Sequence, residues 1–214
     1  MEIILYYAPT ACSLVPYVTL TEANAKFEIR TLNLHKGQHK SADYLKINPK
    51  HKVPLLVVDG QTLSENVAIQ LWIARNFPHA KLLPSDPWQE VQAISLLSWC
   101  ASGIHPYLSR LNSPARVCSV PDTDADVRKL ASAPLFENYK IADDMLAGRE
   151  YFFDHFTAAD AHFFWCFRRG LQFKLDLTGF ANCAAHFERM KGRPSVQKLF
   201  AYEKSVQDAF AKAA

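Results

Sequence analysis

Residues 3–13 read IILYYAPTACS, an apolar run followed by a short loop and a cysteine. The run Ile3–Tyr7 predicts a β-strand, and the pattern over Ser13–Ala23 predicts a helix that begins directly after Cys12. At a helix N-terminus, free backbone N–H groups and the helix dipole favour a thiolate, either the cysteine's own or that of a ligand. This stretch therefore predicts a strand–loop–helix unit that carries a thiol site.

The composition is ordinary for a globular chain and excludes several classes of function. Of 214 residues, 49% are hydrophobic and 21% are charged, and the formal net charge is only +3. This small charge argues against nucleic acid or an anionic membrane as a partner, and no apolar stretch approaches the ~18 residues of a membrane span. The five cysteines form no CxxC pair and no cluster with histidine. We therefore expect no metal site and a reducing, cytoplasmic location.

The first 76 residues alternate between strand and helix patterns. After the first strand and helix, the pattern predicts a strand over Phe27–Leu34 and a short helix over Ser41–Asn48 with Ser41 as its cap. A hairpin follows, in which Leu55–Val58 turns at Asp59-Gly60, and an amphipathic helix covers Glu65–Asn76. This order predicts a small mixed sheet with helices against it, which is the thioredoxin-like arrangement.

The pattern changes after a proline-rich segment, because residues 77–87 contain three prolines and cannot continue a helix. Beyond it, apolar residues recur at helical spacing, Thr157 and Asp160 fit a capping box, and Pro194 fits the first turn of a last helix that ends near Phe210. We therefore predict an α/β thioredoxin-like N-terminal domain over residues 1–78, a linker over 79–87 and an all-α C-terminal domain over 88–214.

Four motifs stand in order along this plan: Tyr7-x-Pro-x-x-Cys12-Ser13, Asn48-Pro49-Lys50-x-x-Val53-Pro54, Ser64-Glu65-Asn66-x-Ala68-Ile69 and Thr157-x-x-Asp160. With them, the whole chain resembles the cytosolic glutathione S-transferase family. The cysteine together with a histidine at 105 is similar to the bacterial beta class. The resemblance implies glutathione as co-substrate, a helical domain that binds a small hydrophobic electrophile, and a homodimer.

The resemblance also implies which residues bind glutathione. A cis bond at Val53-Pro54 would leave the Val53 backbone to pair with the cysteinyl part of the tripeptide, and Lys36 would reach the glycyl carboxylate. Glu65 and Asn66, at a helix N-terminus, would hold the γ-glutamyl end. Asn66 stands where the family commonly has serine or threonine. Ser102 completes the expected glutathione ligands.

Three residues at the end of the first strand or in the loop after it are candidates to stabilise the glutathione thiolate: Cys12, Tyr7 and Ser13. Deprotonation matters because a free thiol, with a pKa of ~8.5, is only partly ionised near neutral pH. The resemblance places His105 opposite the sulfur, where a neutral imidazole can accept a proton. Pro106 and Gly103 predict a kink that re-aims His105.

An apolar electrophile pocket is expected between the domains. Its candidate lining residues share helical positions near His105 or in the helix that follows Asp160, and they are Tyr107, Leu108, Leu111, Phe164, Trp165, Phe167 and Arg168.

The predicted function is conjugation of the glutathione thiolate to small hydrophobic electrophiles. One alternative is a glutathione-dependent thiol–disulfide oxidoreductase, in which Cys12 attacks a mixed disulfide by a monothiol route. A second alternative is a non-catalytic adaptor that keeps the fold and binds a protein. The presence of Val53-Pro54, Glu65 and Lys36 together weighs against the adaptor, which has no need of tripeptide contacts.

Overall fold

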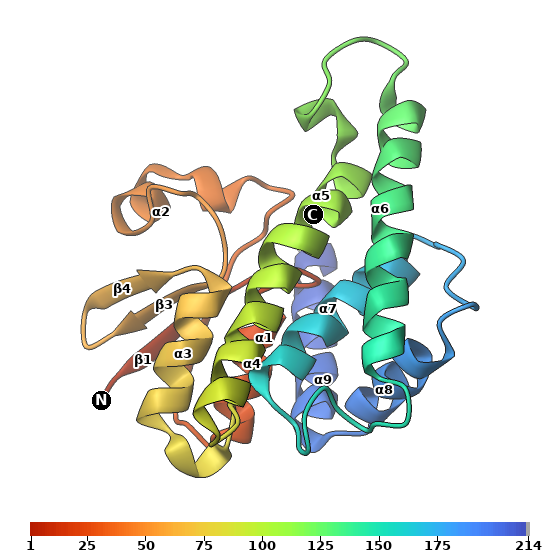
Figure 1. Cartoon of the computed structure of the whole chain (residues 1–214). Coiled ribbons are helices and arrows are strands. Elements are labelled where there is room, and N and C mark those ends of the chain that lie inside the picture. The colour runs from red at the N-terminus through yellow and green to blue at the C-terminus, as the bar shows by residue number, and fades with distance from the viewer. Residues whose placement is uncertain (213–214) are drawn as a thin grey trace. The chain divides into compact units, whose positions relative to one another are not determined.

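The computed structural model describes residues 1–212 and divides the chain into two compact units (Figure 1). One unit combines Met1–Leu83 with the chain from Gly192 onward, and the other is Pro84–Lys191. Each unit has its own buried core, so each is described separately below.

A four-stranded mixed sheet forms the centre of the first unit, as the alternating pattern predicted. The strands are β1 (Ile3–Tyr7), β2 (Glu28–Thr31), β3 (Leu55–Val58) and β4 (Gln61–Ser64), in the order β2-β1-β3-β4. In β1, Leu5 lies opposite Ile29 of the parallel β2 and opposite Leu56 of the antiparallel β3. Because β1 is central, Leu5 and Tyr7 are completely buried. The sheet confirms the predicted thioredoxin-like fold.

Three helices of this unit follow the predicted positions closely. They are α1 (Leu14–Glu22), α2 (Ala42–Ile47) and α3 (Asn66–Asn76), with short 3₁₀ turns at Gln38–Lys40 and Pro78–Ala80. Ser41 caps α2, as predicted, and its side chain accepts the Tyr44 N–H at 3.3 Å. The hairpin turns where expected, with positive φ at Asp59 and Gly60, as the turns of two-residue hairpins require.

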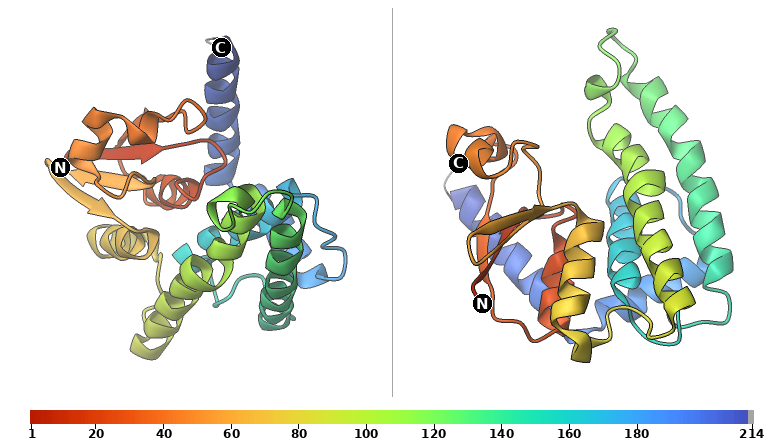
Figure 2. Two further views of the ribbon diagram at one scale, coloured as in Figure 1. Left: turned by 90° about the horizontal axis from the view of Figure 1, so that it is seen from above. Right: turned by 60° about the vertical axis from the view of Figure 1, so that its left-hand side comes forward.

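The last helix, α9 (Pro194–Lys212), packs against α1 and belongs to the first unit (Figure 2). Tyr202 stacks on Tyr17 at 5.6 Å, and Arg193 forms an ion pair with Glu22 at 2.8 Å. The sequence-based division placed 192–214 in the helical domain instead. Helical periodicity reveals that a helix has an apolar face, but it does not identify the element that covers this face.

The second unit contains only helices among its residues, all of which are described. They are α4 (Pro87–Trp99), a π-helical segment (Cys100–Ile104), α5 (His105–Asn112), α6 (Asp124–Met145), α7 (Ala158–Gln172) and α8 (Ala181–Lys191), with a 3₁₀ turn at Pro114–Arg116. Helix α7 is the most buried of them, because α4, α5 and α8 all pack against it. The predicted all-α character of this region is confirmed.

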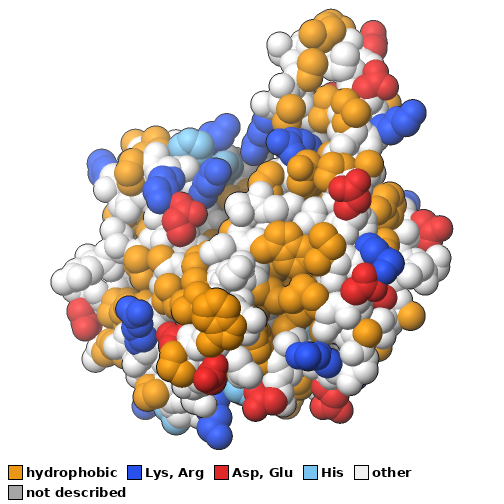
Figure 3. Space-filling model, viewed as in Figure 1, with side chains coloured by type: hydrophobic (Ala, Val, Ile, Leu, Met, Phe, Trp, Pro, Cys, Tyr) orange, Lys and Arg blue, Asp and Glu red, His pale blue; other side chains and the backbone are white. Residues whose placement is uncertain are grey.

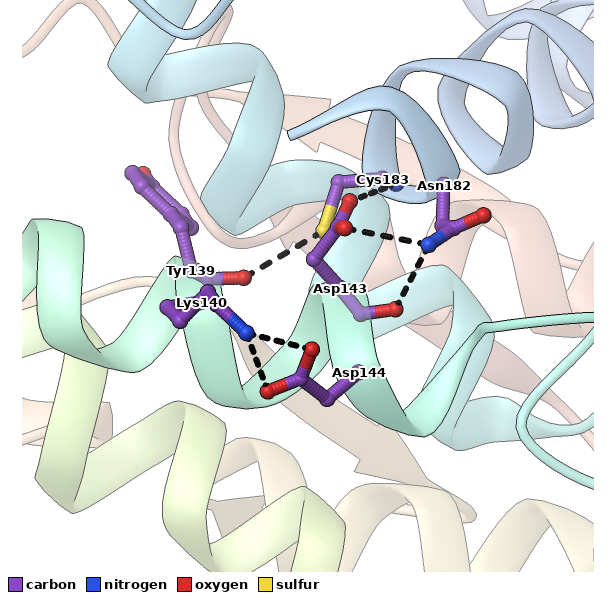
Figure 4. Close-up of polar contacts among 6 residues, drawn as sticks. All are labelled: Tyr139, Lys140, Asp143, Asp144, Asn182 and Cys183. Carbon is purple, nitrogen blue, oxygen red and sulfur yellow. Dashed lines mark hydrogen bonds and ion pairs between the residues drawn. The ribbon is translucent and has the colours of Figure 1, made fainter. Parts of the chain in front are cut away.

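Buried polar contacts fix the ends of α7 and α8. The predicted capping box is present, with Asp160 accepting the Thr157 N–H at 2.8 Å. Asp143 of α6 accepts the Cys183 N–H at 2.9 Å and so caps α8 from a neighbouring helix (Figure 4). The Cys183 thiol donates to the Tyr139 carbonyl at 3.6 Å. These side chains tie the helices together where free N–H groups would otherwise be buried.

Three cysteines of the helical unit behave as small core residues. Cys100, Cys166 and Cys183 are fully buried, whereas Cys118 is only partly buried. All five cysteines lie in the described residues, and none forms a disulfide. Among residues 1–212, no helix combines the length and the apolar character that crossing a bilayer requires.

Candidate functional site

The loop from β1 to α1 places Cys12 at the start of α1, and Ser13 closes this loop. The Ser13 hydroxyl accepts the Ala8 N–H at 3.0 Å and donates to the Ala8 carbonyl at 3.2 Å. Ser13 is fully buried. Its hydroxyl is therefore bonded to the backbone of the loop in this structure, and its expected role as a thiol donor remains a prediction.

A buried carboxylate on α9 holds the same loop from the other side. Glu203 accepts the Thr10 N–H at 2.5 Å and the Tyr7 hydroxyl at 3.3 Å. Thr10 has a positive φ of 62°, a conformation that non-glycine residues adopt only when their surroundings hold them in it. Tyr7 is fully buried with its hydroxyl on Glu203, and its expected role as a thiol donor remains a prediction.

Glu203 was not among the residues predicted from the sequence, although the sequence contains a signal for it. The buried residues of α9 include Val196, Leu199, Glu203 and Val206, which recur at helical spacing. A carboxylate in this otherwise apolar stripe indicates a buried partner, because an unpaired buried charge is costly.

Cys12 is almost buried, with 8% of its surface exposed, and its Sγ donates to the Val53 carbonyl oxygen at 3.5 Å. Burial raises the pKa of the Cys12 thiol to about 12, and the opposing effects of its backbone N–H and of Lys52 are smaller. Desolvation thus outweighs the helix N-terminus, which alone would favour the thiolate. In this structure Cys12 is a neutral thiol near pH 7 and a hydrogen-bond donor.

The turn beside Cys12 has the expected form, since the Val53-Pro54 peptide bond is cis. Tyr44 and Asn48 anchor the approach to it, and both donate to the Lys52 carbonyl, at 2.6 Å and 2.7 Å. Pro54 is buried and Val53 half-buried. The backbone of this turn therefore lies next to the Cys12 thiol on a braced loop.

The start of α3 is arranged differently from the expected γ-glutamyl site. Glu65 is exposed, with φ of 74°, and forms an ion pair with Lys50 at 2.7 Å. The Asn66 Nδ2 donates to the Cys12 carbonyl at 3.1 Å, whereas its buried Oδ1 has no hydrogen-bond partner among residues 1–212. Pro16 has no N–H to offer this carbonyl, and Asn66 supplies a donor there.

Lys36 and Ser102 are both exposed, one in each unit. The Lys36 N–H donates to Asn33 Oδ1 at 3.1 Å in the loop that precedes α2. The Ser102 hydroxyl donates to the Ser98 carbonyl at 2.8 Å, within its own helix. Their expected roles toward glutathione remain predictions.

His105 is the first residue of α5 and directly follows the π-helical segment. This segment is the distortion that Gly103 and Pro106 predicted. A Cβ on Gly103 would lie 2.5 Å from Cδ1 of Trp99, so any larger residue would have to displace the Trp99 ring. The edge of the half-buried His105 ring faces Trp165, with ring centroids 4.4 Å apart. The distorted turn therefore fixes where His105 lies in its unit.

Most of the expected electrophile-binding residues belong to the core of the second unit. Phe164 stacks on Phe187 at 5.2 Å, and Phe167 contacts Tyr139 edge-on at 5.5 Å. Leu108, Leu111 and Trp165 are buried as well. Only Tyr107 and Arg168 are half-buried, and Arg110 lies 4.7 Å above the Tyr107 ring. A role in binding an electrophile thus remains a prediction for this set.

Metal binding has no support among residues 1–212, where no group of three or more His, Cys, Asp or Glu side chains could hold an ion.

Comparisons with known proteins identify the family of this chain. Residues 1–75 match the model of the glutathione S-transferase N-terminal domain. The glutathione S-transferase GstA of Escherichia coli O157:H7 is 32% identical over 203 residues, which cover 93% of this chain and 98% of the relative. The structure of the bacterial beta class glutathione S-transferase of Sphingomonas chungbukensis superposes with a TM-score of 0.83 at 31% identity, covering 95% and 98% of the two chains. A probable maleylacetoacetate isomerase of Caenorhabditis elegans is 36% identical over 104 residues, which cover 48% of each chain.

Proposed function

The chain belongs to the glutathione S-transferase family and is a glutathione transferase with glutathione as its co-substrate, and we propose that it conjugates glutathione to small hydrophobic electrophiles. One observation carries this proposal: the Cys12 thiol lies 3.5 Å from the carbonyl of the cis Val53-Pro54 turn. A backbone edge and a thiol donor are thus adjacent, which is what a bound cysteinyl group with a reactive sulfur requires.

We infer that Cys12 acts as a hydrogen-bond donor to the glutathione sulfur. Since burial raises its pKa to about 12, Cys12 keeps its proton at neutral pH. A neutral S–H that turns from the Val53 carbonyl to a nearby sulfur would stabilise the thiolate of glutathione and lower the pKa of that thiol. The thiolate then attacks the electrophile, a carbon–sulfur bond forms, and the leaving group departs with its electron pair.

The backbone of Val53 and the N-terminus of α3 would bind the tripeptide. Glu65 is exposed and is available to the γ-glutamyl ammonium if it exchanges its ion pair with Lys50. Lys36 would bind the glycyl carboxylate. We propose that the helical unit holds the electrophile and that His105 accepts or donates a proton there.

A homodimer is a further part of the proposal. Large hydrophobic side chains are exposed on α4 and α6 of the helical unit, and the face that carries both helices shows orange patches (Figure 3). Trp88 on α4 is 71% exposed, and Leu130 on α6 is 74% exposed. Exposed hydrophobic side chains of this size can be buried against a partner, and a second copy of the chain is the proposed partner.

A reducing, cytoplasmic location completes the proposal. It is supported by the five cysteines, none of which forms a disulfide although all are described.

The test compares two reactions on wild-type protein and Cys12→Ala. The first is conjugation of glutathione to an activated aryl chloride, and the second is reduction of a glutathione mixed disulfide. We expect conjugation to persist in Cys12→Ala with kcat/KM about tenfold lower, the loss expected for one hydrogen bond to a charged group. Cys12→Ser, which keeps a donor, should fall between the two.

Two outcomes would replace this proposal. Disulfide reduction that exceeds conjugation and disappears in Cys12→Ala would establish the oxidoreductase. If the protein catalyses neither reaction and calorimetry shows no saturable glutathione binding, the non-catalytic adaptor would be the remaining function.

A further inference from the structure

A fully buried histidine on α7 has no role in the site described so far. His162 has 0% of its surface exposed, and neither of its ring nitrogens has a hydrogen-bond partner among residues 1–212. Buried polar side chains are nearly always paired, because an unpaired one costs free energy. Burial, and secondarily the charge of His105, lowers the pKa of His162 to about 3, so this imidazole is neutral at pH 7.

Trp165 links this histidine to His105. It follows His162 by three residues on α7, and such residues lie on the same helix face. The centroid of its ring is 6.2 Å from that of His162 and 4.4 Å from that of His105. The two imidazoles therefore lie against one indole, and the charge of one acts on the other.

We propose that His162 is a positioning residue for His105, which it holds through Trp165 and whose charged form it stabilises with its neutral imidazole. The proposal rests on the role in proton transfer proposed above for His105. A neutral imidazole has one nitrogen lone pair, which is attracted to a nearby imidazolium. A hydrocarbon ring at position 162 would offer no such interaction, and the charged form of His105 would be disfavoured.

Arg168 of α7 is a half-buried cation three residues after Trp165. Other charged groups on the elements around α7 are engaged elsewhere or lie at a distant end. Asp160 binds Thr157 and His186, and Glu90 lies in the first turn of α4. The remaining charged side chains with described partners pair as follows: Arg110 with the Tyr107 ring, Arg169 with Gln172 and Asn112, Arg189 with the Glu150 carbonyl, and Glu188 with Lys191. His105 is the group whose charge acts on His162.

The test is a nuclear magnetic resonance titration of the histidine rings in the full-length protein. The His105 resonance is assigned by its loss in His105→Asn. We expect His162→Phe to lower the pKa of His105 by about 0.5 to 1 unit, which corresponds to the loss of one ordinary polar interaction. His162→Gln, which retains an acceptor, should restore at least half of this shift. Phe164→Leu, a change in the adjacent core of α7, is the control and should leave the pKa of His105 unchanged.

A second readout uses the wild-type protein and covers the case in which His162→Phe does not fold. The His162 ring signal should show no protonation of its own above pH 4, yet it should shift with the midpoint of His105. An unchanged His105 midpoint in His162→Phe, or a His162 signal that ignores this midpoint, overturns the proposal. Neither readout needs catalytic turnover. If His162→Phe shifts the His105 midpoint but the wild-type protein does not conjugate glutathione, the role of His162 stands and the proposed function is refuted.

Discussion

The Cys12 loop and the His105 turn both place a titratable side chain at the start of a helix, but they are held in different ways. Hydrogen bonds to the backbone hold the Cys12 loop, through Ser13, Glu203 and Asn66. His105 instead follows a π-helical segment and packs edge-on against Trp165. The first arrangement fixes the backbone and the second fixes a ring. We therefore expect substitutions to affect the Cys12 loop through lost hydrogen bonds and the His105 turn through packing and charge.

The largest effect is expected for Glu203→Ala, which removes hydrogen bonds that hold the Cys12 loop. It removes the acceptor of the half-buried Thr10 N–H and of the buried Tyr7 hydroxyl, at a cost of about 3 kcal/mol in the free energy of unfolding. Urea denaturation measures the change. Glu203→Gln should recover part of the loss, and Asp208→Ala, at an exposed ion pair on the same helix, is the control. A change under about 0.5 kcal/mol, as for a surface residue, would contradict the role of Glu203.

Acid should destabilise the second unit, because the buried His162 that packs against Trp165 cannot be protonated easily in the folded state. The pKa of His162 is lowered to about 3 in the folded state. Between pH 6.5 and 3, His162 therefore binds a proton in the unfolded chain but stays neutral in the folded protein. Stability should therefore fall as the pH decreases through this range, and His162 accounts for about 2 kcal/mol of the loss by pH 5. Thermal or urea unfolding at pH 7 and pH 5 measures it.

The matched variant His162→Phe should lose less stability between these two pH values than the wild type. An equal loss in both proteins would show that His162 is protonated normally.

Gly103→Ala tests how tightly the turn before His105 is packed. The new Cβ would lie 2.5 Å from the Trp99 ring, whose Nε1 donates to Asn138 at 2.6 Å and so resists displacement. We expect a loss of about 1.5 kcal/mol, typical of overpacking. Gly179→Ala, where nothing lies within 4 Å of the added Cβ, is the control. Equal melting temperatures for the two variants would show that the π-helical turn adapts freely.

The smallest effect is expected for Asn66→Ala, which removes the donor to the Cys12 carbonyl. Because the Val15 N–H also donates to this carbonyl, at 3.1 Å, the expected loss is about 1 kcal/mol. Asn76→Ala removes an exposed side-chain bond on the same helix and is the control. Calorimetry with glutathione should show weaker binding for Asn66→Ala alone. Unchanged binding and stability would assign Asn66 no part in the thiol loop.

Local patterns predicted much of this molecule. The strand before Cys12, the Asp59-Gly60 hairpin and the Thr157–Asp160 capping box each depend on neighbouring residues, and each is present. The motif at Val53-Pro54 correctly predicted a cis bond.

Contacts between distant segments were beyond the reach of these patterns. Glu203 reaches Thr10 across 193 positions, and Asn66 reaches Cys12 across 54. A helical stripe shows that such residues are buried but does not name their partners. The protonation state of Cys12 could not be predicted either. The sequence shows that Cys12 lies at a helix N-terminus, but it does not show how far burial desolvates the thiol.

The pH dependence of Cys12 alkylation tests whether Cys12 is a protonated hydrogen-bond donor. The rate of carbamidomethylation at Cys12 would be followed by mass spectrometry from pH 5 to 10, with Cys118 as the partly buried reference in the same chain. With a pKa of about 12, the Cys12 rate should stay low and rise with pH without reaching a plateau. A plateau with a midpoint near pH 7 or below would show a thiolate at Cys12 and contradict the account.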